Sequence, residues 1–388
     1  MRRSCLAHLN GRSVPIVHTS LTSYCPPVAG RFRSAVSLHS HTSHSREVLT
    51  FLPGLVGKLP VASVLLREKM NRFERETGMP LDFSRGYWRP PLGRRAVFES
   101  EAQQAMTRFG LPWFVSITDH DSIDAGLALA ALGVRDRAPV SVEWTVPYQD
   151  TVFHLGLHNL PPDEAQAMRE ACEELTTVPS PPRLAELLAW VTEETSTLAV
   201  LNHPLWNAHG NLEQGHHALA SLVRELRPLL HATEVNGCRN WTKNRAVVQL
   251  ARAWDMPVVV GDRHGCSPNA FLNLSAAQSF AEFVTEVRRD RRSDVVIMPE
   301  YHEHATTRIL EAAADILRDD SNLEPGQQRW VDRVLVVLED GSTRPLSAFW
   351  THGGPWWVRA CVGAMRLLGG PAARPARRLA FSPQEVTL

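Results

Sequence analysis

The chain has no net charge at neutral pH, because 41 lysine and arginine residues are balanced by 41 aspartate and glutamate residues. A neutral surface gives no electrostatic reason to expect binding to nucleic acid or to a membrane surface. The sequence also lacks an apolar run of the ~20 residues that a membrane span requires. The best candidate, 346–368, is interrupted by Gly353, Gly354 and Pro355. Nucleic acid is therefore an unexpected partner, and no membrane span is expected.

Cysteine is scarce, and its six residues form no Cys-x-x-Cys pair. In a chain of 388 residues this predicts free thiols in a reducing cytoplasm and argues against a disulfide scaffold or a zinc–thiolate site. Residues 1–34 contain no acidic residue and no apolar core of a secretory signal. We expect them to form a disordered extension of a cytoplasmic protein.

Apolar residues make up 44% of the sequence, which is enough for a substantial core. Short apolar runs alternate with longer helical patterns, and this alternation indicates parallel βα units. The expected strands are 35–38, 113–117, 140–142, 152–157, 198–201, 232–235 and 257–260. The expected helices between them are 99–109, 163–175, 183–194, 218–227 and 244–253. An α/β barrel fits this number of strands better than an open doubly wound sheet.

Two regions do not fit the βα repeat. An insertion at about 46–91, with its own helix at 61–77, is longer than a typical βα connection. Residues 299–388 read as a C-terminal appendage of unknown role, with a helix at 305–317 and a strand-like run at 330–338. The main domain is therefore expected to cover 35–298.

Histidines and carboxylates, the residue types that bind divalent metals, gather in five short motifs at or near strand ends. The motifs are His39-Ser40-His41, Asp119-His120-Asp121, Glu143 with His154, Asn202-His203-Pro204 and Asp262-Arg263-His264. Because the carboxyl ends of parallel strands form one rim, the motifs are expected to share one site. Alternative interpretations stay open for single residues: Asp121 as a helix cap, His158 in place of His154, and His203 as a buried structural residue.

The order of these motifs resembles that of the polymerase and histidinol phosphatase (PHP) family over residues 35–298. The resemblance implies a distorted (β/α)7 barrel that binds two or three Zn, Mn or Fe ions. His39, His41, Glu143 and Asp262 would hold the first ion, and Glu143 would bridge to a second ion on His154 and His203. His120 and His264 would hold a third.

The third ion site is where the sequence departs from the family, because Arg46 stands where an aspartate is usual. His44 or Glu47 could substitute, or the site could be weak or absent. Without a third ion, His264 is the candidate general acid. Arg263, Arg239 and Arg89 are candidates for binding the substrate phosphate, since arginine pairs bidentately with phosphate.

The function predicted from these features is a metal-dependent phosphoesterase, in which a metal-activated hydroxide attacks a small phosphorylated substrate. One alternative is an amidohydrolase-like enzyme on a similar barrel. Such a site often uses a strand-end lysine, and Lys58, Lys69 and Lys243 end no expected strand. The other alternative is a non-catalytic metal-binding module. The sequence does not indicate the oligomeric state.

Overall fold

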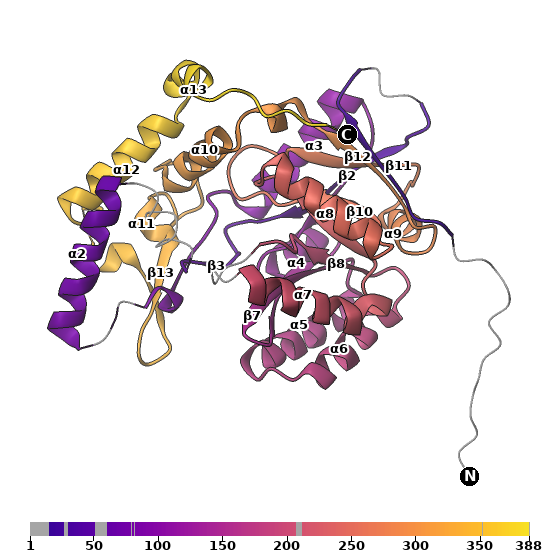
Figure 1. Cartoon of the computed structure of the whole chain (residues 1–388), viewed down its shortest axis with the longest axis horizontal. Helices are drawn as coiled ribbons and strands as arrows, with labels where there is room; N and C mark the ends of the chain where they lie inside the picture. The colour runs from indigo at the N-terminus through magenta and orange to yellow at the C-terminus, as the bar shows by residue number, and fades with distance from the viewer. Residues whose placement is uncertain are drawn as a thin grey trace, which may run out of the picture.

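The computed structural model describes residues 15–26, 30–50, 60–78, 80, 82–206, 212–350 and 352–387. An α/β body lies beside a smaller unit built from the insertion and the C-terminal segment (Figure 1). The body contains two five-stranded sheets in the described part of the chain. In order, the first is β1 (His18–Ser23), β12 (Arg292–Ile297), β11 (Phe271–Ser275), β2 (Ser34–Ser40) and β5 (Trp113–Ile117). The second is β10 (Val258–Gly261), β9 (Ala232–Asn236), β8 (Leu198–Asn202), β7 (Thr151–His158) and β6 (Val142–Tyr148).

Helices of the body follow the strands along the chain. They are α3 (Arg94–Phe109), α4 (Asp124–Ala131), α5 (Pro162–Thr177), α6 (Pro181–Glu193), α7 (Leu212–Leu226), α8 (Trp241–Ala253) and α9 (Phe280–Arg288). Their ends have local causes. Prolines, whose fixed φ suits a first helical turn, begin α5 and α6. The Asn240 side chain accepts a hydrogen bond from the backbone N–H of Lys243 and so caps α8.

The expected α/β alternation is present, but the strands do not form a closed barrel. Parallel pairing joins β2 to β5, β8 to β9 and β9 to β10. In contrast, β7 is antiparallel to both β6 and β8, because a tight turn at Gln149 and Asp150 makes β6 and β7 a hairpin. Within the described ranges, the two sheets are joined by two isolated bridges, Ser40 with Arg263 and His120 with Glu143. The structure therefore shows a mixed α/β fold of two sheets that meet at one rim.

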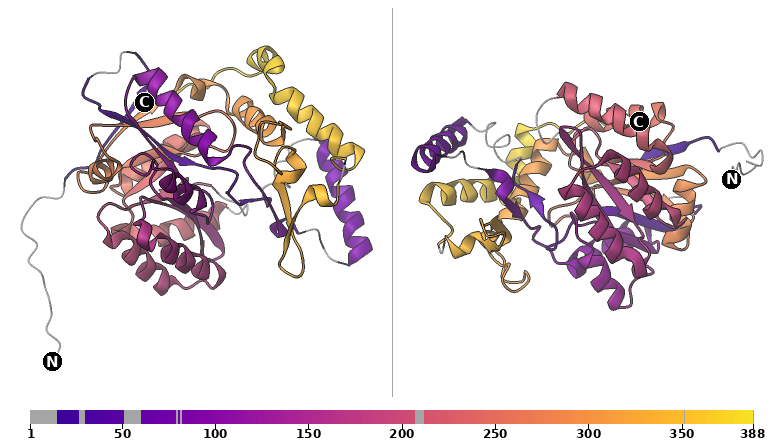
Figure 2. Two further views of the ribbon diagram at one scale, coloured as in Figure 1. Left: turned by 180° about the vertical axis from the view of Figure 1, so that it is seen from behind. Right: turned by 90° about the horizontal axis from the view of Figure 1, so that it is seen from below.

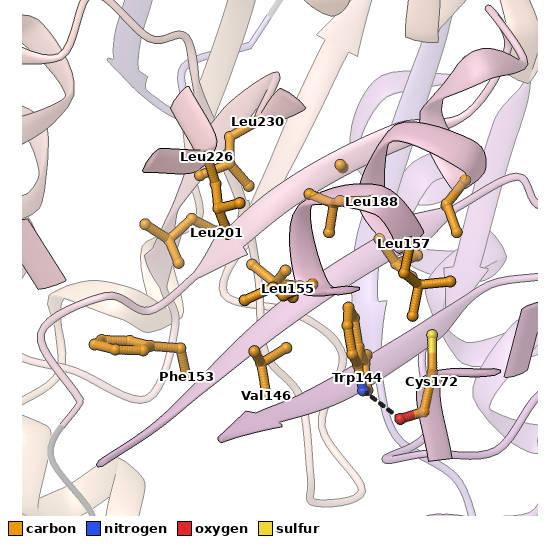
Figure 3. Close-up of a cluster of buried hydrophobic side chains, with 14 of the residues drawn as sticks. Trp144, Val146, Phe153, Leu155, Leu157, Cys172, Leu188, Leu201, Leu226 and Leu230 are labelled. Carbon is orange, nitrogen blue, oxygen red and sulfur yellow. Dashed lines mark hydrogen bonds between the residues drawn. The ribbon is translucent and has the colours of Figure 1, made fainter. Parts of the chain in front are cut away.

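The core fills the space between and around these sheets. Val36 and Leu38 of the first sheet pack in one cluster with Val200 and Val259 of the second. A larger cluster lies between the β6–β7 hairpin and helices α5, α6 and α7. Figure 3 shows Trp144 in this cluster, where its indole N–H donates to the backbone carbonyl of Cys172 at 3.1 Å. Apolar burial on both faces of the second sheet fixes the strands whose ends carry the candidate metal ligands.

The N-terminal segment differs from the prediction of a disordered extension. Residues 18–23 form β1, which pairs in parallel with β12 from His18 opposite Arg292 to Ser23 opposite Ile297. Sequence inspection also missed β11 and β12, because buried polar residues such as Asn273 and Asp294 interrupt their apolar patterns. The edge that β12 offers explains why the short polar β1 is ordered, since ladder hydrogen bonds replace an apolar pattern. Of the predicted extension, residues 1–14 and 27–29 lie outside the described residues.

The insertion and the C-terminal segment, which were expected to be separate, share one four-stranded sheet. Its order is β14 (Thr343–Pro345), β13 (Val334–Val337), β4 (Gly86–Trp88) and β3 (Glu47–Val48). The helices of this unit are α2 (Pro60–Thr77), α10 (Ala305–Leu317), α11 (Trp330–Arg333), α12 (Trp356–Gly369) and α13 (Arg374–Ala380). Both views in Figure 2 place these segments on the same side of the body. Of the helices in the described ranges, none has the length and apolar character to cross a membrane.

Candidate metal centre

Nine imidazole and carboxylate side chains from seven strands and the loops next to them converge at the rim where the two sheets meet. Their ligand atoms form overlapping groups in which the atoms lie within 4.8 Å of one another. The groups are His39, His41 and Asp262; His39, Glu143 and His203; His120, Glu143 and His154; His41, Glu47, His120 and His264; and Cys238, Asp262 and His264. Every ligand proposed from the sequence belongs to a group, and Glu47 joins them. The motifs that lie apart in the sequence therefore come together at one rim, as the sequence predicted.

The two histidines of the first motif are aimed at one point by an irregularity in β2. The pairing of β2 with β5 shifts register between Ser37 and Ser40, so an extra residue is accommodated there. His39 takes a φ of 56°, and its Nε2 lies 2.9 Å from Nε2 of His41. Close approach of β10 requires a glycine at 261, because a Cβ there would lie 2.4 Å from the carbonyl oxygen of Leu38. The bulge and the glycine together bring His39 and His41 to the rim.

Four of the eight described non-glycine residues with positive φ lie at this rim. His39, Asp121, His203 and Asp262 all have φ between 25° and 79°, in the left-handed region that non-glycine residues rarely adopt. Each such residue costs on the order of 1–3 kcal/mol and persists only where its surroundings enforce it. Strain of this kind is typical of functional sites. Its coincidence with three of the sequence-predicted ligands supports a functional role for the rim.

Glu143 lies at the centre of the cluster and is completely buried. Its Oε2 is 2.9 Å from Nε2 of His39 and 3.2 Å from Nε2 of His120, while its Oε1 is 3.1 Å from Nε2 of His203. Burial alone would raise the pKa of Glu143, but the imidazoles, His39 first among them, hold it well below its ordinary value. Glu143 is therefore an ionised carboxylate with each oxygen directed to a different group of histidines, as a bridging ligand requires.

The structure separates His154 from its sequence competitor His158. Nδ1 of His154 is 3.6 Å from Oε1 of Glu143, and its ring lies 5.1 Å from that of His203. His158 instead contacts Ser116 Oγ through its own Nδ1 at 2.7 Å, away from the ligand groups. Glu143 is the second residue of β6 rather than the end of a strand, and His154 reaches the rim from within an antiparallel strand. These two residues are thus positioned by the hairpin and not by a βα unit.

Glu47 occupies the position that the sequence left open. Its Oε2 lies 3.2 Å from Nε2 of His264 and 3.4 Å from Nε2 of His120. Burial would raise its pKa, but His41, His264 and His120 hold the pKa of Glu47 far below its usual range. Arg46 is exposed, with its guanidinium 6.0 Å from the centre of the Tyr87 ring. His44 is no substitute, because its Nε2 lies 3.1 Å from a guanidinium nitrogen of Arg94.

Three buried residues to which the sequence analysis gave no role position the ligands. The carboxylate of Glu234 contacts Nδ1 of His39, the arrangement that fixes ring orientation and leaves Nε2 free for a metal. The Asn236 amide donates to Asp262, and the Asn202 amide donates to Oε1 of Glu143 at 2.9 Å. The available signal was polar residues inside apolar strands: Thr-Glu-Val-Asn ends β9 and is buried throughout.

Arg263, which was expected to bind phosphate, directs most of its guanidinium to acceptors inside the protein. Arg263 is buried, and its guanidinium donates to the backbone carbonyls of Ser267 at 2.7 Å and Cys266 at 3.0 Å and lies 3.5 Å from Glu101. Internal acceptors hold Nε and Nη2 of Arg263, whereas its Nη1 has no hydrogen-bond partner among the described residues, so a catalytic or phosphate-binding role for Arg263 stays a prediction. Among the remaining candidates, Arg89 has a buried Nε with no hydrogen-bond partner among the described residues. Arg89 therefore stays a candidate for binding the substrate phosphate.

The donor set fits divalent metal ions. Imidazole nitrogens and carboxylate oxygens are the ligands of Zn²⁺ and related ions. Nδ1 of His154 is buried without a hydrogen-bond partner among the described residues, which is costly unless a ligand engages it. Imidazole nitrogens that approach each other, as in His39 and His41, are likewise expected where both face one ion.

Comparison with known proteins adds little to this picture. No family model matches the sequence, and no curated protein matches it. Among solved structures, an amidohydrolase from Chromobacterium violaceum with bound sulfate and no metal is 14% identical, with a TM-score of 0.35, over 59% of this chain and 87% of that one. A candidate metal-dependent phosphoesterase from Bifidobacterium adolescentis is 16% identical, with a TM-score of 0.30, over 51% and 91%. PsfC from Pseudomonas syringae is 12% identical, with a TM-score of 0.37, over 54% and 86%.

At these TM-scores the likeness establishes neither the fold nor the activity of this chain. The resemblance to the PHP family therefore stays a prediction. The class of protein that the site supports, a metal-dependent hydrolase, depends on the ligand groups at the rim.

Proposed function

We propose that the protein is a metal-dependent phosphoesterase with a three-ion centre. The observation that carries the proposal is the set of overlapping ligand groups, two of which share Glu143. His39, His41 and Asp262 would hold one ion, His154 and His203 a second, and Glu47, His120 and His264 a third. Divalent ions at these positions would lower the pKa of a bound water and neutralise charge on a phosphoryl group.

The charge of the site favours a phosphate ester. Three carboxylates, Glu47, Glu143 and Asp262, belong to the ligand groups. They would neutralise only half of the charge of three divalent ions, and the excess positive charge would attract an anionic substrate. For the described lysines, Lys69 lies on α2 and Lys243 on α8, so neither supplies the strand-end lysine of an amidohydrolase-type centre. The phosphoesterase is therefore preferred.

The contacts of His264 bear on which group donates a proton to the leaving group. Both nitrogens of His264 face carboxylates, Nδ1 at 2.8 Å from Asp262 and Nε2 at 3.2 Å from Glu47. Burial would lower its pKa, but Asp262 and Glu47 raise the pKa of His264 well above its ordinary value. In the metal-free protein His264 would carry a proton. With an ion on Nε2 it would be a ligand, and the leaving group would take its proton from water.

Elemental analysis of the purified protein, with hydrolysis of p-nitrophenyl phosphate and bis(p-nitrophenyl) phosphate, tests the proposal. We expect bound Zn, Mn or Fe and phosphatase activity that a chelator removes and metal restores. His39→Ala and Asp262→Asn should each reduce activity at least 100-fold, whereas the exposed His217→Ala should not. Absence of both bound metal and metal-stimulated hydrolysis would overturn the proposal. Hydrolysis of amides alone would replace it with the amidohydrolase alternative.

A further inference from the structure

The sheet shared by the insertion and the C-terminal segment reaches into the metal centre. Its edge strand β3 is only two residues long and begins with Glu47. In the described residues β3 pairs with β4 alone, where Glu47 lies opposite Trp88 and Val48 opposite Tyr87. The backbone position of Glu47 is therefore set by β4.

The strand β4 is in turn held from its other side by the C-terminal segment. Trp88 and Tyr87 lie opposite Val334 and Leu335 of β13, and the backbone N–H of Arg89 donates to the carbonyl of Arg333 at 2.9 Å. Two-stranded pairs are marginal in water, and a third strand is needed for independent stability. Two ladder pairs between β3 and β4 could not fix Glu47 without β13.

The strand β13 is anchored firmly. Arg333, immediately before it, is buried and donates to the backbone carbonyls of Gln327, Ile316 and Arg318 at 2.6–2.7 Å. These acceptors tie the start of β13 to the end of α10. Because α10 packs along α12, β13 belongs to a helix-supported unit and not to a loose tail.

The side chain of Glu47 is fixed from the body of the protein. Ser45 Oγ donates to Oε1 of Glu47 at 2.6 Å and accepts from the backbone N–H of His120 at 3.0 Å. The Trp88 ring, which is buried opposite Glu47 on β4, lies 5.9 Å from the ring of His264. The body thus orients the carboxylate, while the shared sheet determines whether its backbone is in place.

We infer that β13 is a positioning element for the third ion. By holding β4, and through it β3, the C-terminal segment places Glu47 beside His120 and His264, whereas the first two ions are held by the body alone. The inference rests on the proposed function for the three-ion centre. It assigns to the C-terminal segment a role in metal loading that is separate from folding of the body.

Metal stoichiometry of the full-length protein tests the inference. Leu335→Asp places a charge at a position that is 8% exposed and opposite Tyr87, and should separate β13 from β4. We expect it to bind two ions where the wild type binds three, with a circular dichroism spectrum like that of the wild type. The matched control is Thr343→Asp, on the exposed end of β14, which should keep all three ions.

Two further variants keep the test decisive. Gly86→Ala is a milder change, in which the new Cβ would lie 2.9 Å from Cδ1 of Leu49, a side-chain end that can move, and 3.2 Å from the backbone carbonyl oxygen of Leu335. It replaces Leu335→Asp if that variant does not fold. Glu47→Gln removes the third-ion carboxylate directly. If β13 acts through Glu47, the double variant Glu47→Gln/Leu335→Asp should bind the same number of ions as either single variant.

The outcomes distinguish the inference from the proposed function. Three ions bound with wild-type affinity in the β13 or β4 variant would overturn the inference, as would loss of every ion. A wild type that binds two ions, unaffected by Glu47→Gln, would also overturn it and leave a two-ion phosphoesterase standing. A wild type that binds none would remove the proposed function itself.

Discussion

Glu234→Gln should weaken binding of the first ion without weakening the fold. The Glu234 carboxylate contacts Nδ1 of His39, and both side chains are buried. That contact keeps the imidazole proton on Nδ1, so the lone pair of Nε2 points toward His41 and Glu143, each 2.9 Å away. Glutamine can accept this proton without a charge, or turn its amide and donate to Nδ1 instead. In the second orientation the proton moves to Nε2, and His39 stops being a ligand.

The magnitude follows from this loss of orientation and charge. Replacing a carboxylate behind a metal-binding histidine typically costs 10- to 100-fold in metal affinity, or about 1.4–2.7 kcal/mol. In the absence of metal, the Glu234→Gln variant should be as stable as the wild type or more stable. Burial raises the pKa of Glu234, although His39 opposes this shift, and Oε1 has no hydrogen-bond partner among the described residues. Burying a charged carboxylate at position 234 costs folding free energy, so a neutral amide at the same position should be tolerated.

Competition with a fluorescent chelator would measure the affinity, and thermal unfolding with and without metal would measure stability. The matched control is Glu286→Gln, since Glu286 is a half-buried carboxylate that accepts from Ser275 Oγ at 2.6 Å and belongs to no ligand group. We expect the control to bind metal as the wild type does. Wild-type affinity in Glu234→Gln, at unchanged stoichiometry, would refute the role assigned to this carboxylate.

Three further predictions concern separate parts of the molecule. His154→Ala should remove one ion from the stoichiometry and leave the others, which elemental analysis would show; an unchanged ion count would remove His154 from the ligands. Burial, with Arg288 and Arg227, lowers the pKa of His231 to about 3. The unfolded chain therefore takes up a proton below pH ~6.5 that the folded protein refuses, so stability should fall as pH drops from about 6.5 toward 3, by up to about 1.4 kcal/mol per pH unit. His231→Gln should flatten this part of the curve in urea unfolding; the same slope in the variant would contradict the assignment. Arg263→Met should destabilise the protein by about 3–5 kcal/mol, because it leaves the buried carboxylate of Glu101 without its cationic partner, although Ser37 and Asn269 still donate to it. It should not raise KM, and a selective rise in KM without loss of stability would return Arg263 to the phosphate site.

Several features could be predicted from the sequence because their signals are local. The strand at 113–117 and the helix at 305–317 have the bounds that their apolar patterns predict. The motifs containing His39, Glu143 and Asp262 combine residue types that bind metals with positions near strand ends. Local pattern and residue chemistry were therefore enough to identify the candidate ligands, while the metal-dependent chemistry stays a prediction.

The antiparallel β7 was not predictable in the same way, because a hairpin and a βα connection both begin with an apolar run. Interrupted patterns hid β11 and β12, whose buried polar residues bond to one another across strands. Asn273 donates to Ser293 Oγ at 2.8 Å, for example. Glu234 and Asn236 had no recognisable motif, because their partners lie far along the chain. Hydrogen bonds between distant residues leave no periodic trace in a sequence.

Taken alone, the sequence determined which side chains could hold metal ions and in what order along the chain they occur. Tertiary structure decided which of them meet: it brought Glu47 rather than His44 to the third group, and it directed Arg263 into the protein interior. The physical reason is that ligand identity is a property of single residues, whereas convergence within 4.8 Å depends on strand pairing between segments far apart. Pairing of β4 with β13, across about 250 residues, is the contact that no local pattern could reveal.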